Sequence, residues 1–86
     1  MATAKVIMYT TPWCGFCAAA KALLKKKGVE FEDIDVSNDA ELRDHMISIS
    51  GRTSVPQIFI NDEHIGGFDD MNALDQAGEL DGRLGL

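Results

Sequence analysis

The sequence predicts an α/β fold in which a four-stranded mixed β-sheet is flanked by helices, in the order βαβαββα. Short apolar stretches typical of strands alternate with longer helical stretches. An Asn61-Asp62 step between two strand-like segments predicts a β-hairpin near the end of this order. The length of 86 residues suits a single domain, residues 1–86.

The first strand and the first helix are separated by a turn. Residues 5–10 contain a short apolar run and predict a buried strand, which Thr11-Pro12 ends. Residues 15–27 predict a helix, because alanine and leucine dominate this stretch. Three lysines in its last turn suit the helix dipole, and Gly28 is the expected C-cap.

The next stretch of the sequence predicts a second strand followed by a second helix. Residues 29–36 alternate apolar and acidic side chains and predict a strand. Ser37 or Asn38 is the expected N-cap of the next helix, and Glu41 would complete a capping box with Asn38. Gly51 is the expected end of this helix. Three apolar residues form its expected inner face: Leu42, Met46 and Ile49.

The last third of the chain predicts a hairpin and a helix. Residues 57–60 and 63–65 are the two expected hairpin strands. Gly66-Gly67 should break the second strand, and Asp69 or Asp70 should cap a helix that runs to about residue 78. The first βαβ unit predicts a parallel pair of strands with a right-handed crossover, and the hairpin adds an antiparallel edge.

Charge and cysteine content limit the classes of function. Eight Lys and Arg against 14 Asp and Glu give a net charge of −6, which argues against nucleic acid and anionic membranes as partners. The apolar run near the start is too short for a secretory signal or a membrane span. Two cysteines are too few for a disulfide-stapled scaffold. We therefore expect a cytoplasmic protein whose cysteine pair is catalytic or metal-binding.

The motif Cys14-Gly15-Phe16-Cys17 carries the chemistry of this sequence. It lies between a strand and a helix, so Cys14 should be at or near the N-cap. The amides of Phe16 and Cys17 should point toward its sulfur, and together with the helix dipole they favour the thiolate, the form that attacks disulfides. Cys17 is one helical turn later, close enough to form a disulfide with Cys14 but more shielded. We expect an attacking and a resolving cysteine.

Two other interpretations of the cysteine pair remain open but are less favoured. A zinc site needs four ligands, and His45 and His64 lie on different elements without metal-ligand spacing. We therefore expect no bound metal. A purely structural disulfide is disfavoured in the reducing compartment that the cysteine content indicates.

Three segments resemble one known family. Residues 11–17 read Thr-Pro-Trp-Cys-Gly-Phe-Cys and resemble the active-site segment of the thioredoxin superfamily. Residues 53–60 are similar to the cis-proline loop and following strand of that superfamily, and residues 65–70 to the γ-glutamyl site of glutaredoxins. The chain thus resembles a glutaredoxin of the small bacterial dithiol type over residues 4–81. This resemblance implies the thioredoxin fold.

The resemblance also implies an activity. It implies a glutathione-dependent thiol-disulfide oxidoreductase that reduces protein–glutathione mixed disulfides and protein disulfides, with Cys14 as nucleophile and Cys17 as resolving thiol. The expected partners are glutathione and glutathionylated or disulfide-bonded proteins, and the expected state is a monomer. One alternative is a carrier in which two chains share a [2Fe–2S] cluster through Cys14 and glutathione, which Gly15 would allow but Trp13 and Phe16 should hinder. Another is a thioredoxin-like protein reduced by a flavoenzyme.

The resemblance further implies where glutathione binds. The γ-glutamyl carboxylate should lie at the start of the last helix and its ammonium at Asp70, while the cysteinyl residue pairs with the backbone of Val55. Many glutaredoxins have Lys or Arg where Thr11 stands, so Arg43, or less favourably Arg52, should hold the glycyl carboxylate. The implied binding residues are Phe16, Arg43, Ser54, Val55, Pro56, Gly67, Phe68, Asp69 and Asp70.

Overall fold

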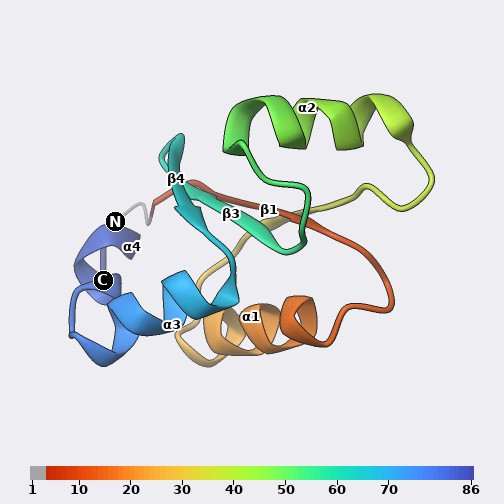
Figure 1. The fold of residues 1–86 in the computed structure, drawn as a ribbon. Helices are drawn as coiled ribbons and strands as arrows, with labels where there is room; N and C mark the ends of the chain where they lie inside the picture. Colours follow the sequence, from red (N-terminus) through yellow and green to blue (C-terminus); the bar gives the residue numbers. More distant parts are fainter. Residues whose placement is uncertain (1–3) are drawn as a thin grey trace.

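The strands form one mixed sheet at the centre of the molecule (Figure 1). The computed structural model describes residues 4–86. The strands are β1 (Val6–Thr10), β2 (Glu32–Asp35), β3 (Gln57–Ile60) and β4 (Glu63–Gly66). Their order is β2-β1-β3-β4; β1 pairs parallel with β2, and β3 pairs antiparallel with both β1 and β4. The predicted four-stranded mixed sheet is confirmed.

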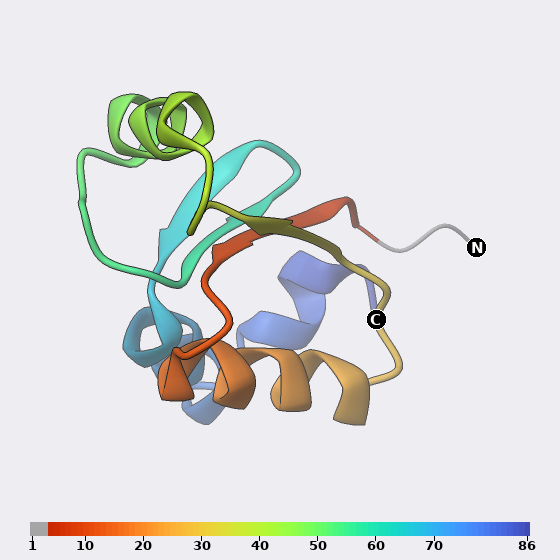
Figure 2. The same cartoon turned by 90° about the vertical axis from the view of Figure 1, so that its right-hand side faces the viewer.

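Helices cover both faces of this sheet. They are α1 (Gly15–Lys26), α2 (Ala40–Ser50), α3 (Phe68–Gln76) and α4 (Leu80–Leu84). In Figures 1 and 2, α1 and α3 lie on one face and α2 lies alone on the other. The order is therefore the predicted βαβαββα with one additional short helix at the end.

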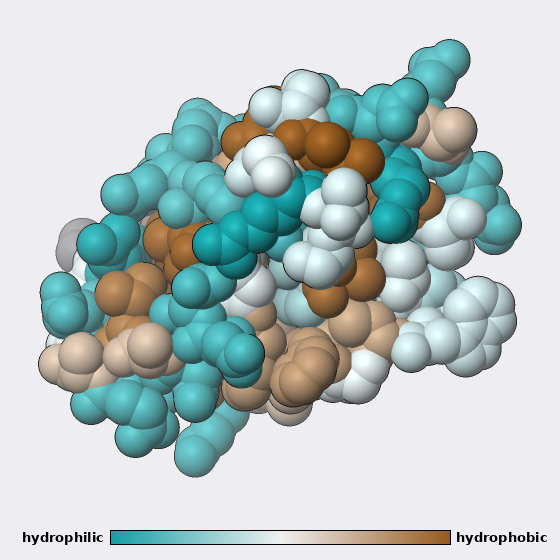
Figure 3. All heavy atoms as spheres, in the orientation of Figure 1, coloured by the Kyte–Doolittle hydropathy of each residue, from teal (hydrophilic) through white to brown (hydrophobic). Residues whose placement is uncertain are grey.

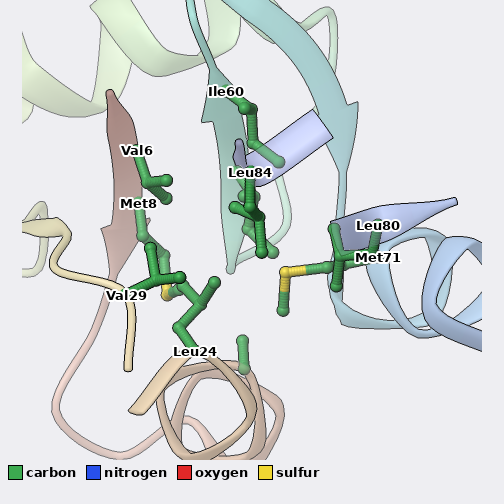
Figure 4. Packing of buried hydrophobic residues seen from close by; sticks show 10 residues of the cluster. Val6, Met8, Leu24, Val29, Ile60, Met71, Leu80 and Leu84 are labelled. Carbon is green, nitrogen blue, oxygen red and sulfur yellow. The ribbon is translucent and has the colours of Figure 1, made fainter. Parts of the chain in front are cut away.

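Two hydrophobic clusters hold the layers together. Alternation along β1 sends Val6 and Met8 to the face covered by α1 and α3, and Ile7 and Tyr9 to the face covered by α2. The larger cluster lies under α1, α3 and α4, and Figure 4 shows Leu24, Met71 and Leu84 converging there. Each fully buried side chain of this size contributes about 1.5–3 kcal/mol to folding.

Strand β2 is shorter than the predicted stretch of residues 29–36. Only Glu32–Asp35 pairs with β1. Val29 and Val36 are nevertheless buried, on opposite faces of the sheet, so the apolar pattern extends beyond the paired residues. Strand β2 is an edge, and its exposed acidic side chains disfavour pairing with another chain.

Helix α2 departs from the prediction at its start and on its inner face. Its N-cap is Asp39, whose Oδ1 accepts the N–H of Leu42 at 3.1 Å, so neither Ser37 nor Asn38 caps it. It packs on the sheet through Leu42, Met46 and Ile47. Ile49, expected inside, is 40% exposed because it lies at the edge of that packed face. Gly51 ends the helix in the left-handed conformation, as predicted.

The hairpin turn is confirmed, but the start of α3 differs from the prediction. Asn61 and Asp62 both have positive φ, at 51° and 67°, as a type I′ turn requires. The N-cap of α3 is Gly67, so Asp69 and Asp70 lie in the first turn, where the Asp70 carboxylate accepts the N–H of Gly67 in a capping box. There they can still favour the helix N-terminus, because acidic groups suit its dipole.

Helix α4 was not predicted. Leu80 and Leu84 are four residues apart, both are fully buried, and together they form its inner face. Gly82 and Gly85 weaken the helical signal in the sequence. The end of α1 is tied to this region, because Lys27 Nζ lies 2.7 Å from Asp75 Oδ1 and 2.6 Å from Asp81 Oδ1.

Hydrophilic residues cover much of the face shown in Figure 3, and hydrophobic residues reach the surface in separate places. Within residues 4–86, no helix has the length and apolar character needed to cross a bilayer.

Candidate active site

Three segments that are distant in the sequence meet at one corner of the molecule. They are the start of α1, the loop before β3 and the start of α3, which lie near one another at the lower left of Figure 2. An open, shallow pocket at this corner is lined by residues of all three segments. The sheet therefore brings the predicted cysteine motif and the two predicted binding segments together.

Cys14 is the N-cap of α1, as predicted. Its Sγ accepts the N–H of Cys17 at 3.0 Å and lies 3.6 Å from the carbonyl oxygen of Val55, to which the thiol donates. Of the two amides expected to point at the sulfur, that of Cys17 forms this bond. The first turn of α1 carries no acidic side chain, so the positive end of the helix dipole acts on the sulfur without a competing carboxylate nearby in the helix.

Cys17 lies in a very different environment. Both cysteines are free thiols, but Cys17 is only 1% exposed while Cys14 is partly exposed. Burial, followed by its hydrogen bond with Cys14, raises the pKa of the Cys17 thiol to about 12. Cys17 is therefore a protonated, shielded thiol at neutral pH, which fits a resolving thiol better than an attacking one.

The loop before β3 lies next to Cys14. The Val55–Pro56 peptide bond is cis, as the resemblance implied. Pro56 is buried and Val55 half-buried. Two aromatic side chains form the outer rim, since Trp13 is 89% and Phe16 62% exposed. The Phe16 ring also stacks on that of Phe68 at 6.3 Å between centroids, which links α1 to the start of α3.

The start of α3 is organised around Asp70. Its Oδ2 accepts the N–H of Gly67 at 2.9 Å and the guanidinium of Arg52 at 2.9 Å. These two contacts, the backbone one first, hold the pKa of the Asp70 carboxyl below its ordinary value. Gly66 has a φ of +120°, and a Cβ there would lie 2.3 Å from Asp70 Oδ2, so only glycine leaves room for this arrangement.

The pocket collects most of the residues implied for glutathione binding. Arg52, the less favoured candidate for the glycyl carboxylate, lines it, whereas Arg43 does not. Arg43 instead donates from Nη2 to the carbonyl oxygen of Thr53 at 2.9 Å, on the loop that leads into the pocket. The other lining residues are Phe16, Ser54, Val55, Pro56, Gly67, Phe68, Asp69 and Asp70.

Sequence reasoning missed one buried polar group beside this pocket. Gln57 follows the cis proline, is fully buried, and binds both Ser54 and His64 through its side-chain amide. The only signal for it was a polar residue at the start of the otherwise apolar stretch Gln57–Ile60.

The arrangement supports thiol–disulfide exchange. The partly exposed sulfur of Cys14 accepts a hydrogen bond from a backbone amide at a helix N-terminus. The second thiol lies one helical turn further along α1. The adjacent pocket is lined by both positively and negatively charged side chains. Among residues 4–86, no group of three or more His, Cys, Asp or Glu side chains could hold a metal ion.

Comparison with known proteins agrees with this geometry. The model of the glutaredoxin family matches residues 6–65. Glutaredoxin 3 of Escherichia coli strain K12 is 53% identical over 78 residues, which cover 91% of this chain and 94% of that protein. The solution structure of glutaredoxin from Brucella melitensis matches with a TM-score of 0.86 and 51% identity, covering 98% of this chain and 91% of that one.

A more distant structure shares the fold. The crystal structure of a buckwheat glutaredoxin–glutathione complex matches with a TM-score of 0.88, covering 95% of this chain and 77% of that one. Its sequence identity is 24%, so this similarity concerns the fold alone.

Proposed function

Because the chain belongs to the glutaredoxin family and is therefore a thiol-disulfide oxidoreductase, we propose that it draws its electrons from glutathione and attacks disulfides through Cys14. One observation carries this proposal most directly. The sulfur of Cys14 accepts the N–H of Cys17 at the N-terminus of α1, beside a pocket that offers charges of both signs. An N–H donated to sulfur stabilises negative charge on it, and the thiolate is the attacking form.

The first route uses Cys14 alone. Its thiolate attacks the glutathione sulfur of a protein–glutathione mixed disulfide, the old S–S bond breaks, and the protein leaves as a thiolate. The enzyme is then glutathionylated on Cys14. The thiolate of a second glutathione attacks the bound glutathione sulfur, which releases oxidised glutathione and restores the Cys14 thiolate. Two electrons pass from glutathione to the substrate disulfide.

The second route reduces disulfides between protein thiols. Cys14 attacks one sulfur, forming a mixed disulfide and releasing the other as a thiolate. Cys17 loses its proton and attacks the sulfur of Cys14, so the substrate leaves reduced and the enzyme holds a Cys14–Cys17 disulfide. One glutathione attacks Cys14 and frees Cys17, and a second removes the first as oxidised glutathione. Cys17 must lose its proton in this route, and burial raises the pKa of its thiol.

Glutathione carries two carboxylates and one ammonium, and the pocket offers matching groups. The N-terminus of α3 suits the γ-glutamyl carboxylate, and the acidic pair Asp69 and Asp70 suits the ammonium. The backbone of Val55 suits β-type pairing with the cysteinyl residue. Arg43 remains the proposed partner of the glycyl carboxylate, with Arg52 as the alternative that lines the pocket.

A [2Fe–2S] carrier is the less favoured function. The described residues bring no three metal-binding side chains together, so a cluster would need ligands from a second chain and from glutathione. Cys17 competes for Cys14, and the exposed rings of Trp13 and Phe16 stand where a second chain would approach. The redox route needs one chain only, since both thiols and the whole pocket belong to it.

We extend the proposal to partners and compartment. The substrates are glutathionylated or disulfide-bonded proteins, and the working form is a monomer in the cytoplasm, where a pool of reduced glutathione keeps such a cycle turning. We expect no binding to nucleic acid or anionic membranes, because a protein with a net charge of −6 repels their phosphate groups.

The test is a coupled assay with two electron sources. The protein is given a glutathionylated peptide, with either glutathione plus glutathione reductase or thioredoxin reductase, and NADPH consumption is followed. We expect turnover with glutathione and none with thioredoxin reductase alone. Turnover with thioredoxin reductase and none with glutathione would contradict the proposal.

A further inference from the structure

A buried amide side chain connects the hairpin to the loop that borders the active site. Gln57 is 0% exposed, which is rare for a polar residue and requires that its amide be satisfied. Its Nε2 lies 3.0 Å from the carbonyl oxygen of Ser54 and 3.4 Å from the Ser54 hydroxyl. Its Oε1 lies 2.7 Å from Nε2 of His64 on β4.

The chemistry of these atoms fixes the direction of every bond. A carbonyl oxygen only accepts, so Gln57 must present its N–H group to Ser54. The amide oxygen of Gln57 therefore faces His64, and His64 must donate from Nε2. His64 orients Gln57, and Gln57 in turn orients Ser54. The three residues form a directed relay from β4 to the loop before β3.

This relay determines which way a backbone N–H points. The carbonyl of Ser54 and the N–H of Val55 belong to one peptide unit, which is trans, and in a trans peptide the two groups point in opposite directions. Gln57 holds the carbonyl from the buried side of the loop. The N–H of Val55 therefore points away from the buried Gln57 side chain, and both residues of this peptide unit line the pocket.

We propose that His64 and Gln57 are positioning residues that lock the Ser54–Val55 peptide so that the Val55 N–H is presented to the backbone of an extended cysteinyl ligand. Under the proposed function, on which this inference rests, that ligand is glutathione or the glutathione half of a mixed disulfide. The carbonyl oxygen of Val55 lies 3.6 Å from the Cys14 sulfur. The same loop therefore contacts the nucleophile and orients the glutathione sulfur that the nucleophile attacks. Preorganised donors avoid the cost of ordering the loop when the ligand arrives.

The surroundings of His64 favour a neutral imidazole, and its bond to the Gln57 oxygen places the single proton on Nε2. Its ring packs against Phe59 at 5.0 Å between centroids and is half-buried. Burial, and secondarily the nearby charge of Arg52, lower the pKa of His64, while Asp70 opposes this shift. The Phe59 contact also makes phenylalanine a close packing substitute without a donor.

The kinetic test uses three variants and one control. His64→Phe keeps the ring but removes the donor, Gln57→Glu places a carboxylate against the Ser54 carbonyl, and His64→Gln restores an N–H. His45→Phe is the matched control, because His45 is an exposed histidine whose ring contacts Tyr9 and takes no part in the bonds of Gln57. The first measurement is the KM for glutathione with a glutathionylated peptide as substrate. The second is the rate at which iodoacetamide alkylates Cys14. Iodoacetamide is a small reagent that does not pair with the Val55 backbone, so it reports on the sulfur alone.

We expect His64→Phe and Gln57→Glu to raise the KM for glutathione by roughly three- to tenfold, the effect of one lost hydrogen bond. Cys14 alkylation should stay within about twofold of the wild type. His64→Gln should recover most of the KM, and His45→Phe should change neither measurement. Wild-type KM values in both relay variants, or equal effects in His45→Phe, would overturn the inference.

A second readout does not depend on turnover with glutathione. In amide NMR spectra, the Gln57 side-chain N–H should exchange slowly with solvent in the wild type and faster in His64→Phe, and the Val55 backbone amide should shift with it. His64→Gln should reverse both changes. Unaltered Gln57 and Val55 amides in His64→Phe would refute the relay even if glutathione proved to be the reductant. Altered amides in a protein that does not use glutathione would uphold the relay and refute only the proposed function.

Discussion

Two helix N-termini meet at the active corner, and they are built in opposite ways. Helix α1 has no acidic side chain in its first turn, and a cysteine sulfur is its capping acceptor. Helix α3 begins with Asp69 and Asp70, and Asp70 is further bound by the guanidinium of Arg52. The N-terminus of α1 thus faces a cysteine sulfur, whereas the N-terminus of α3 is surrounded by charged side chains.

This difference separates chemistry from recognition. At α1 the helix end and the Cys17 amide both stabilise negative charge on one atom, which is what a nucleophile and leaving group requires. At α3 the backbone amides and the carboxylates lie side by side, which suits a zwitterionic group such as an amino acid end. Variants at the first site should change whether the reaction occurs, and variants at the second should change how well the ligand binds.

The largest effect should come from removing the sulfur at the start of α1. Cys14→Ser keeps an N-cap acceptor for α1, so the fold should persist, but no nucleophile remains. We expect turnover of every disulfide substrate to fall by at least roughly a thousandfold. Steady-state assays with a glutathionylated peptide and with a protein disulfide measure this. Retained activity in a correctly folded Cys14→Ser protein would show that the reactive site lies elsewhere.

The second largest effect should be selective. Cys17→Ser removes the buried resolving thiol but leaves the surroundings of Cys14 largely intact. We expect removal of glutathione from peptides to stay within about threefold of the wild type, while reduction of a protein disulfide falls by roughly tenfold or more. The ratio of the two rates in one preparation is the readout. Equal loss of both activities would mean that the first route does not operate.

Breaking the charge pattern at α3 should affect binding more than chemistry. Asp70→Lys places a cation where the glutathione ammonium should lie, and we expect the KM for glutathione to rise by about tenfold, less at high salt. Alkylation of Cys14 by iodoacetamide should change little. Asp44→Lys, on the exposed face of α2, makes the same change in net charge and should leave the KM unaltered. A similar rise in KM for both variants would show that the effect comes from the net charge of the protein and not from the position of Asp70.

The smallest effect concerns stability. The pKa of Asp70 is lowered in the folded chain by the Gly67 amide and then by Arg52, so its carboxylate stabilises the fold above the ordinary carboxyl pKa near 4. That contribution is lost as the pH falls through the lowered value. Asp70→Asn should therefore be less stable than the wild type at pH 7, and the gap should narrow toward pH 3. Urea midpoints at both pH values test this, with Asp44→Asn as control; a gap that widens in acid would contradict it.

Much of the fold and the cap at Cys14 could be predicted from local sequence. The cap at Cys14, the turn at Asn61-Asp62 and the helix end at Gly51 each depend on residues within a few positions, and the structure confirms all three. Apolar stretches likewise predicted the strands, and the βαβ unit followed by a hairpin predicted the mixed sheet. Caps, turns and helix ends depend on the residues at those positions and on their immediate neighbours, so a single sequence is enough to predict them.

What could not be predicted depends on contacts between distant segments. The Arg52–Asp70 pair joins positions 18 apart, and the bond of Arg43 to Thr53 depends on where the loop returns after α2. Helix α4 is stabilised by packing of Leu80 and Leu84 under the sheet, against the weak propensity of its glycines. Which arginine faces the pocket is therefore a property of the folded chain, and no spacing rule could assign it.

Glutathione exchange at Cys14 is tested most directly by the intact mass of Cys17→Ser after exposure to oxidised glutathione. We expect one glutathione per chain, located on Cys14 by peptide mapping, and its complete release by reduced glutathione at neutral pH. This outcome requires a sulfur at the start of α1 that takes up glutathione and releases it again to a second glutathione. A chain that stays unmodified, or an adduct that reduced glutathione fails to remove while dithiothreitol does, would contradict the central claim.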